Sequence, residues 1–69
     1  MGLKKTRVRL HMEKGPTVEG LMVKRPKGRG GYFLISAGEL LHASGERSQF
    51  TSDVTIPRER VIMYEQVRA

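Results

Sequence analysis

The stretch Thr6-Arg7-Val8-Arg9-Leu10-His11-Met12 decides the fold class of this 69-residue chain, because polar and apolar side chains alternate along all of it. A repeat of two residues is the signature of a β-strand that places one face on a core. Val8, Leu10 and Met12 are therefore expected to face that core. The sequence Lys14-Gly15-Pro16 follows, and it predicts a turn that ends the strand.

A second strand is expected from Thr17 to Arg25, with a bend inside it. Val18 and Met22 share one face with Gly20, whereas Leu21 points to the other face. Because both faces carry apolar residues, we expect a bend or bulge at Gly20 that buries each face in turn. Such a strongly curled strand in a short sheet indicates a small barrel.

The rest of the chain predicts three more strands and the connections between them. The strands are expected at residues 32–37, 54–56 and 61–67; loops or turns are expected at 26–31, 43–53 and 57–60. Residues 37–43 fit either a single helical turn or a short strand, and Gly38 favours strand or irregular structure. The predicted fold is all-β: a single small, strongly bent five-stranded barrel over residues 6–69, with little or no helix, after a basic tail at residues 1–5.

A domain of this size has a small core, which rarely supplies more than about 3–5 kcal/mol of stability. The chain has no cysteine, and this excludes disulfides, thiolate-bound zinc, iron–sulfur clusters and cysteine nucleophiles. We therefore expect the chain to be stabilised by association, in a homo-oligomer or with other protein subunits.

No stretch of the sequence is apolar for long enough to span a membrane. The longest apolar runs are Tyr32-Phe33-Leu34-Ile35 and Val61-Ile62-Met63-Tyr64, whereas a membrane helix needs about 20 residues. Basic residues interrupt the first twelve positions, which is unlike a secretory signal. We expect a protein that does not bind membranes and is kept inside a cell, or inside a particle assembled there.

The positive charge lies in the first half of the chain. Residues 1–30 hold nine of the 13 Lys and Arg residues and two acids, whereas residues 31–69 hold four basic and five acidic residues. Such a distribution attracts polyanions, which could be nucleic-acid phosphates, anionic lipid headgroups or an acidic protein surface, or it serves solubility alone.

Residues with catalytic or metal-binding chemistry are few. His11 and His42 are the only imidazoles and Asp53 is the only aspartate, so the sequence offers no convincing Ser/His/Asp triad. A metal site built from His11, Glu13 and His42 is conceivable but not expected from two separated histidines. We expect no enzyme activity, no cofactor and no metal site.

The order of the predicted elements resembles the Sm-like family. The resemblance lies in Val8-Arg9-Leu10-His11-Met12, Gly15 and Thr17-Val18-Glu19-Gly20-Leu21, and in the ending Val54-Thr55-Ile56-Pro57-Arg58-Glu59-Arg60-Val61. It implies a bent barrel and, for RNA-binding members, rings that read single strands. The usual N-terminal helix and the Asp/Asn pair before the third strand are missing from this sequence, so base recognition by those residues is not implied.

Three other phrases are similar to short proteins encoded among the structural genes of actinobacterial tailed phages: Thr17-Val18-Glu19-Gly20-Leu21-Met22-Val23, residues 31–34 and Ile56-Pro57-Arg58-Glu59-Arg60-Val61. This similarity implies a virion component. The leading hypothesis is therefore a non-enzymatic assembly protein of a phage virion (a minor capsid, decoration or head–tail component) that binds its neighbours through strand edges and a basic face. The alternative is an Sm-like, ring-forming protein that binds single-stranded RNA in the cytoplasm.

The candidate binding residues are basic or lie in loops. Arg7 and Arg9 share the outer face of the first strand by the two-residue repeat, and Lys24 or Arg25 could extend them into a basic band. The full set for a partner or polyanion is Lys4, Lys5, Arg7, Arg9, Lys24, Arg25, Lys27 and Arg29, with Tyr32, Arg58 and Arg60 as loop contacts. Nucleic-acid binding by this set would be unspecific, and the expected partners are subunits of a larger assembly such as a capsid shell.

Overall fold

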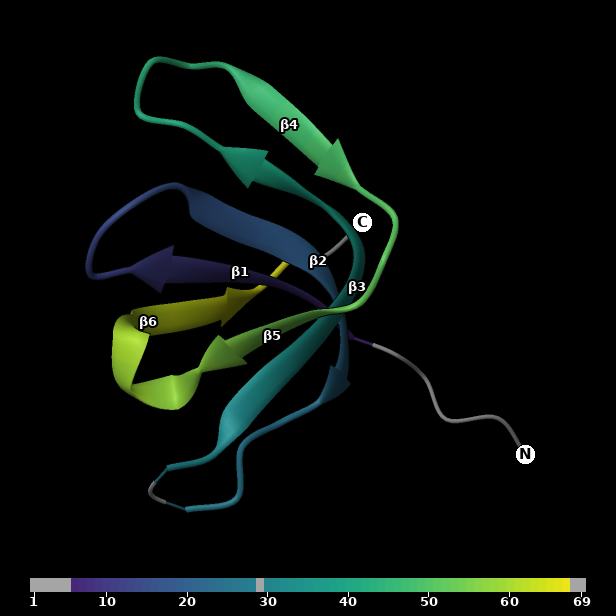
Figure 1. Ribbon diagram of the computed structural model, residues 1–69, viewed down its shortest axis with the longest axis vertical. Coiled ribbons are helices and arrows are strands. Elements are labelled where there is room, and N and C mark those ends of the chain that lie inside the picture. The colour runs from purple at the N-terminus through teal and green to yellow at the C-terminus, as the bar shows by residue number, and fades with distance from the viewer. Residues whose placement is uncertain (1–5, 29, 68–69) are drawn as a thin grey trace.

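The computed structural model describes residues 6–28 and 30–67, which form one antiparallel β-sheet and a single turn of 3-10 helix (Figure 1). The elements are β1 (Thr6–Met12), β2 (Thr17–Lys24), β3 (Tyr32–Leu41), β4 (Arg47–Phe50), β5 (Val54–Pro57), η1 (Arg58–Arg60) and β6 (Val61–Gln66). None of the described helical residues forms a helix that is long and apolar enough to cross a membrane. The prediction of an all-β fold with almost no helix is confirmed.

The six strands follow the order β4-β3-β2-β1-β6, and β5 pairs with β3. β2 occupies one edge of the long strand β3, so β4 and β5 follow each other along its other edge. β4 pairs with residues 38–41 and β5 with residues 32–35 of β3. Within the described residues the sheet is not closed, because β5 and β6 do not pair with each other.

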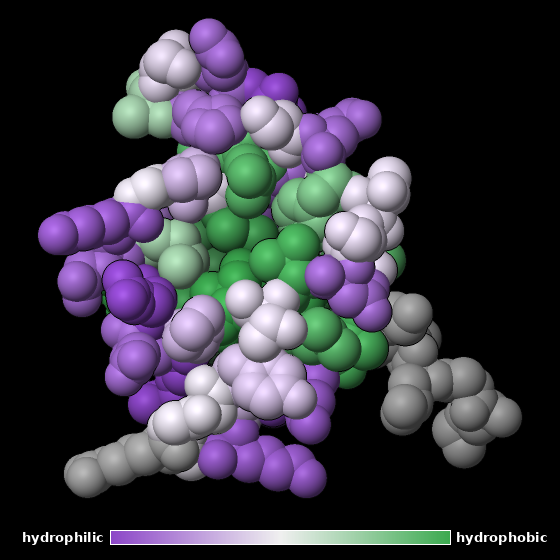
Figure 2. All heavy atoms as spheres, in the orientation of Figure 1, coloured by the Kyte–Doolittle hydropathy of each residue, from purple (hydrophilic) through white to green (hydrophobic). Residues whose placement is uncertain are grey.

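The core lies on the concave side of the sheet and is small. Its buried side chains are Val8, Leu10, Val18, Met22, Phe33, Ile35 and Ile56, and five half-buried apolar residues pack against them. Val8 and Leu10 are fully buried, as the alternation in the first strand predicts, and Met12 is half-buried. The apolar residues are gathered in the middle of the face seen in Figure 2, within a border of hydrophilic ones.

The sheet bends where two glycines meet. A methyl group built on Gly20 would lie 2.7 Å from Cγ2 of Ile35, and one built on Gly38 would overlap the carbonyl group of Glu19. The β2–β3 register shifts between Glu19 and Leu21, which confirms the predicted irregularity at Gly20. Ala37, beside Gly38, has a φ of 46°, a left-handed conformation that is rare for a residue with a side chain. The bend therefore depends on backbone contact that only glycine permits.

The strand prediction is wrong in one region. Residues 43–53 are expected to form a loop or hairpin tip, but residues 47–50 form β4. β3 continues past the expected end at 37 through residue 41, so residues 37–41 adopt the strand that Gly38 favours and not the alternative helical turn. The described residues thus contain six strands, whereas five were expected. β4 was missed because its first three residues are polar and exposed, so no apolar alternation marks it. The predicted basic tail, residues 1–5, lies outside the described residues.

Candidate functional site

β6 presents the most exposed apolar side chains of the described chain. Ile62 is 70% exposed, Met63 55% and Tyr64 45%. β6 pairs with β1 on one side, and no described strand pairs with its other edge. Natural sheets usually protect a free edge with lysine, proline or a bulge. β6 (Val-Ile-Met-Tyr-Glu-Gln) has a bulge at Ile62, where the register shifts, and one charged residue, Glu65, but it carries neither lysine nor proline.

The backbone atoms on the free edge of β6 can be identified from the ladder with β1. The Val67 N–H donates to the Arg7 carbonyl at 2.8 Å, so Val67 points its backbone groups toward β1. In an antiparallel ladder this direction alternates from residue to residue. The N–H and C=O groups of Tyr64 and Gln66 therefore face outward and are oriented to pair with an added strand.

The other two edge strands are better protected. The first residues of β4, Arg47-Ser48-Gln49, are polar, and β5 ends in Pro57. Charge and proline both discourage edge-to-edge pairing. Of the edges formed by described residues, that of β6 is the one best suited to bind another chain.

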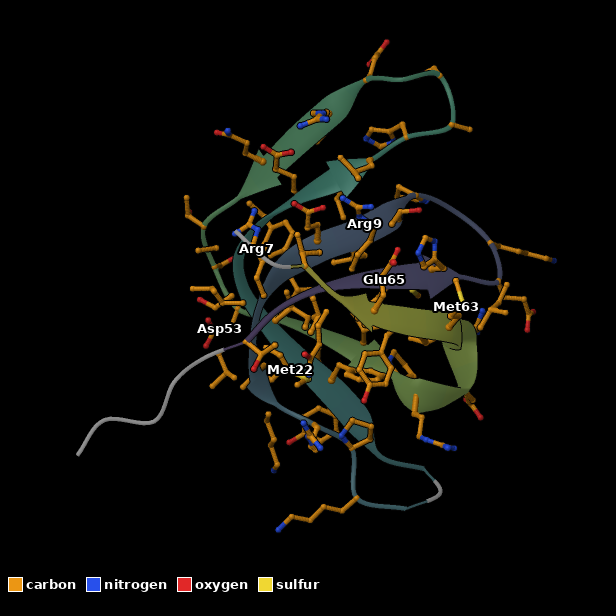
Figure 3. All side chains as sticks on the ribbon, turned by 180° about the vertical axis from the view of Figure 1, so that it is seen from behind. Arg7, Arg9, Met22, Asp53, Met63 and Glu65 are labelled. Carbon is orange, nitrogen blue, oxygen red and sulfur yellow. The ribbon has the colours of Figure 1, made fainter. Side chains whose placement is uncertain are left out.

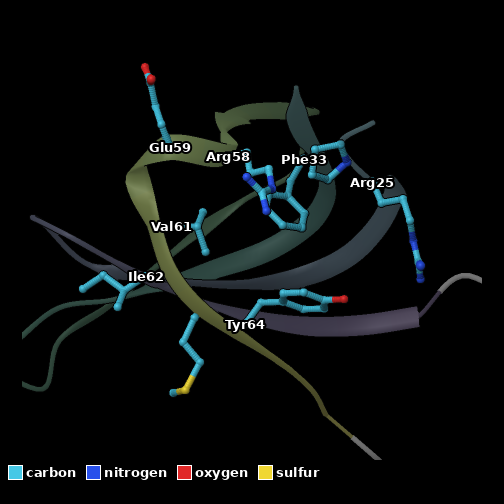
Figure 4. A pocket seen from close by; sticks show the side chains of 9 residues that line it. Arg25, Phe33, Arg58, Glu59, Val61, Ile62 and Tyr64 are labelled. Carbon is cyan, nitrogen blue, oxygen red and sulfur yellow. The ribbon is translucent and has the colours of Figure 1, made fainter. Parts of the chain in front are cut away.

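A groove of about 510 Å³ opens beside β6 (Figure 4). Phe33, Val61 and Tyr64 supply its apolar wall, and the rings of Phe33 and Tyr64 are 5.5 Å apart and tilted by 60°. Tyr64 pairs with the buried Leu10 and thus lies on the core side of the sheet, yet it is 45% exposed. The groove is therefore a place where the core side of the sheet is left open.

Two arginines stand at this groove. Arg58 belongs to η1, and its backbone N–H donates to the Gly31 carbonyl at 2.9 Å, which fixes η1 against the loop before β3. Arg25 follows the end of β2, and both guanidinium-bearing side chains line the groove. Among the described residues, neither arginine forms an ion pair. The Glu59 side chain, also at the rim, points away from Arg58 in Figure 4. The groove thus combines apolar walls with unpaired positive charge.

Arg7 and Arg9 lie on the outer face of the sheet, where acidic residues pair with them. Arg9 contacts Glu19 at 2.8 Å and Glu65 at 3.8 Å, and Arg7 contacts Glu19 at 3.3 Å. Figure 3 shows Arg9 and Glu65 together on this face. The register places Glu19, and not Lys24, opposite Arg9. The continuous basic band that the sequence suggests is therefore interrupted by carboxylates.

Glu19 is held in its ionised form by these arginines. The hydrogen bond from Arg9 is the largest cause that lowers the pKa of Glu19; partial burial opposes it, and the charge of Arg9 and the contacts of Arg7 add to the lowering. A carboxyl group whose pKa is lower in the folded than in the unfolded chain stabilises the fold at neutral pH. That contribution is lost as the pH falls below the ordinary glutamate range and through the lowered folded value.

Replacing Glu19 by glutamine is expected to reduce the free energy of unfolding at pH 7 by about 1–2 kcal/mol, because two arginines lose their charged acceptor. The difference from the wild type should shrink as the pH falls below the ordinary glutamate range and through the lowered folded value, because Glu19 itself then becomes protonated. Urea unfolding followed by circular dichroism at several pH values measures both effects. Glu13→Gln, an identical change in an exposed turn, is the control and should leave stability within about 0.5 kcal/mol. A constant difference across the pH range would contradict the assigned role of the Glu19 charge.

The other predicted binding residues fall into separate places. Lys24 donates to the Tyr32 hydroxyl at 3.3 Å and lies 5.1 Å from the centre of its ring. Together with Arg25 and Lys27 these two residues line a second, smaller hollow of about 120 Å³. Arg60 is exposed, and its carbonyl accepts from the Glu13 N–H. Lys4, Lys5 and Arg29 lie outside the described residues.

The histidines do not meet. His11 contacts Glu65 at 2.8 Å, and His42 contacts Ser48 at 2.9 Å. In the described part of the chain no three His, Cys, Asp or Glu residues are placed to hold a metal ion.

Reasoning from the sequence missed the residues of the free edge. Ile62 and Met63 are expected in the last strand and are absent from the predicted binding residues, although the run Val61-Ile62-Met63-Tyr64 breaks the alternation that an edge strand with one solvated face should show. That break was the available signal. Glu19 was also missed, since only the strand register places it opposite Arg9 and within reach of Arg7.

Comparison with known proteins adds no relative: the chain matches no protein-family model and is significantly similar to no curated protein.

Proposed function

We propose that this chain is a non-enzymatic assembly protein that docks onto neighbouring protein subunits by adding a strand to the free edge of β6. The observation that carries the proposal is the exposure of Ile62, Met63 and Tyr64 along that edge. A monomer rarely leaves an apolar strand edge uncovered, because such an edge pairs with other chains. Strand addition supplies backbone hydrogen bonds, and the neighbouring groove supplies a place for side chains.

The small size of the core supports the same proposal. Seven buried side chains form the centre of the molecule, and a core of this size leaves a narrow margin of stability. A partner that binds only the folded chain stabilises it by mass action.

The finer form of the proposal is an Sm-like barrel in a phage virion, as a minor capsid, decoration or head–tail component. The short link η1 before the last strand and the contact between Phe33 of β3 and Tyr64 of β6 are in keeping with a small barrel that is open beside β6. The virion setting rests on the sequence resemblance alone. Mass spectrometry of gradient-purified virus particles tests it: the chain should be present at a fixed ratio to the shell protein, and its absence would remove this setting.

Sedimentation velocity of the isolated chain tests the docking proposal. If the docking partner is a second copy, the isolated chain should form a discrete oligomer; if the partner is another protein, the chain should remain a monomer that melts at or below the 45–65 °C usual for mesophilic domains. Gln66→Pro removes an outward N–H of β6 and no bond to β1, so it should weaken oligomer formation or partner binding while the fold persists; Gln66→Thr is its control. A monomer that melts above about 70 °C, with a Gln66→Pro variant that binds as the wild type does, would contradict the proposal.

A second candidate function is binding of single-stranded RNA. The cluster of Lys24, Arg25, Lys27 and Tyr32 favours it, because cationic side chains beside an aromatic ring suit single strands. Electrophoretic titration with single-stranded RNA at about 0.15 M salt separates the candidates. Tight, sequence-sensitive binding would support the RNA function, whereas weak retention that disappears with added salt would support docking to protein.

A further inference from the structure

From the charges around the groove beside β6, we infer that the docking partner is an acidic, extended segment of another protein: a strand that pairs with the β6 edge, places an apolar side chain in the groove and sets a carboxylate against Arg58 and Arg25. This inference rests on the proposed docking function and names the chemistry of its partner.

The first argument is where unpaired charge lies. Arg7 and Arg9 are engaged by Glu19 and Glu65, whereas Arg25 and Arg58, which line the groove, form no ion pair within the described residues. A guanidinium group binds a carboxylate through two parallel hydrogen bonds, and the contact strengthens when a partner excludes water from it. The groove therefore favours a partner that brings an acidic side chain.

The second argument is the placement of the apolar wall. A strand bound to the outward groups of Tyr64 and Gln66 would run beside β6, which itself forms one side of the groove. Alternate side chains of that strand point to the core side of the sheet, where Phe33, Val61 and Tyr64 leave room. An apolar side chain in that position would cover the half-exposed ring of Tyr64.

The third argument distinguishes another protein from a second copy of this chain. The formal net charge is +6, so two copies repel each other at long range. An acidic segment is instead attracted, and its association is faster at low salt. A second copy would also bring its own two arginines toward the same groove edge.

Peptide selection on the full chain tests the inference. A library of random peptides of about 10 residues, long enough to form one strand, is selected against the purified chain, and the most enriched peptide is synthesised and titrated by fluorescence anisotropy. Enriched peptides should alternate apolar and polar residues and carry Asp or Glu beside an apolar anchor. Arg58→Glu and Arg25→Glu should each lower affinity about 10- to 100-fold. Lys14→Glu, which makes the same charge change in an exposed turn, should alter it by less than about threefold.

The fold of each variant is checked by circular dichroism, and Arg58→Lys should recover part of the affinity, since it restores the charge but not the paired hydrogen bonds. Neutral or basic enriched peptides, the absence of any enrichment, or equal losses in Arg58→Glu and Lys14→Glu would overturn the acidic partner. If enriched neutral or basic peptides bind the Gln66→Pro variant more weakly than the wild type, the acidic partner is rejected but docking to the β6 edge is retained. Self-association that buries the groove and is lost in Ile62→Asp would show instead that a second copy of the chain occupies the groove. Salt-resistant RNA binding that requires Arg58 would show that the partner is RNA and not a protein.

Discussion

Replacing Gly38 by alanine is expected to unfold the domain at 25 °C, with a loss of more than about 4 kcal/mol. A methyl group at this position would overlap the Glu19 carbonyl group and lie 2.8 Å from the Gly20 Cα. These atoms belong to the backbone of β2, so the overlap cannot be relieved by rotating a side chain. The strands would have to separate at the bend that brings the two ends of the sheet around the core.

Gly45→Ala is the matched control for this change. Gly45 has a φ of 97°, but no atom lies within 4 Å of the methyl group that alanine would add. The loss there should be limited to the cost of a left-handed residue, about 1–2 kcal/mol. Urea unfolding and a two-dimensional amide NMR spectrum would compare the two variants. A Gly38→Ala protein with a native spectrum and a loss no larger than that of Gly45→Ala would mean that β2 and β3 are not in close contact at the bend.

The parts of the fold that could be predicted from the sequence are those marked by alternating apolar and polar residues or by turn residues. β1 and β2 and the bend at Gly20 follow from the apolar period and one glycine, and β5, η1 and β6 follow from Pro57 between two β-forming runs. β4 could not be predicted in this way. It is held by pairing with residues 38–41, a contact that depends on the bent path of β3 and leaves no mark in a polar segment.

The candidate site was predictable in its composition but not in its arrangement. The sequence identifies the basic residues, but an arginine binds a partner only if the fold leaves its charge unpaired. Strand register decides this: it sets Glu19 opposite Arg9 and within reach of Arg7, whereas Arg25 and Arg58 arrive at the groove from elements far apart in the chain. Strand register and the approach of η1 to the loop before β3 are set by the tertiary structure, so local sequence patterns do not predict them.

The same substitution at two isoleucines, one buried and one exposed, separates an effect on stability from an effect on docking. Ile35 is fully buried in the core, whereas Ile62 is 70% exposed on β6. Ile35→Ala removes the same atoms as Ile62→Ala but leaves a cavity, so it should cost about 2–5 kcal/mol, as much as the whole core of a domain this small supplies. The protein should then be largely unfolded at 37 °C unless a partner is bound.

Ile62→Ala is expected to leave the free energy of unfolding within about 0.5 kcal/mol of the wild type, because the side chain is mostly in water in the isolated chain. The same change should weaken binding of a strand to the β6 edge by about 10-fold, since the partner would bury this side chain. Thermal melting and titration with the selected peptide measure the two effects on the same samples. If Ile62→Ala lost as much stability as Ile35→Ala, its side chain would belong to the core; if it changed neither stability nor binding, the apolar edge of β6 would not be the docking surface.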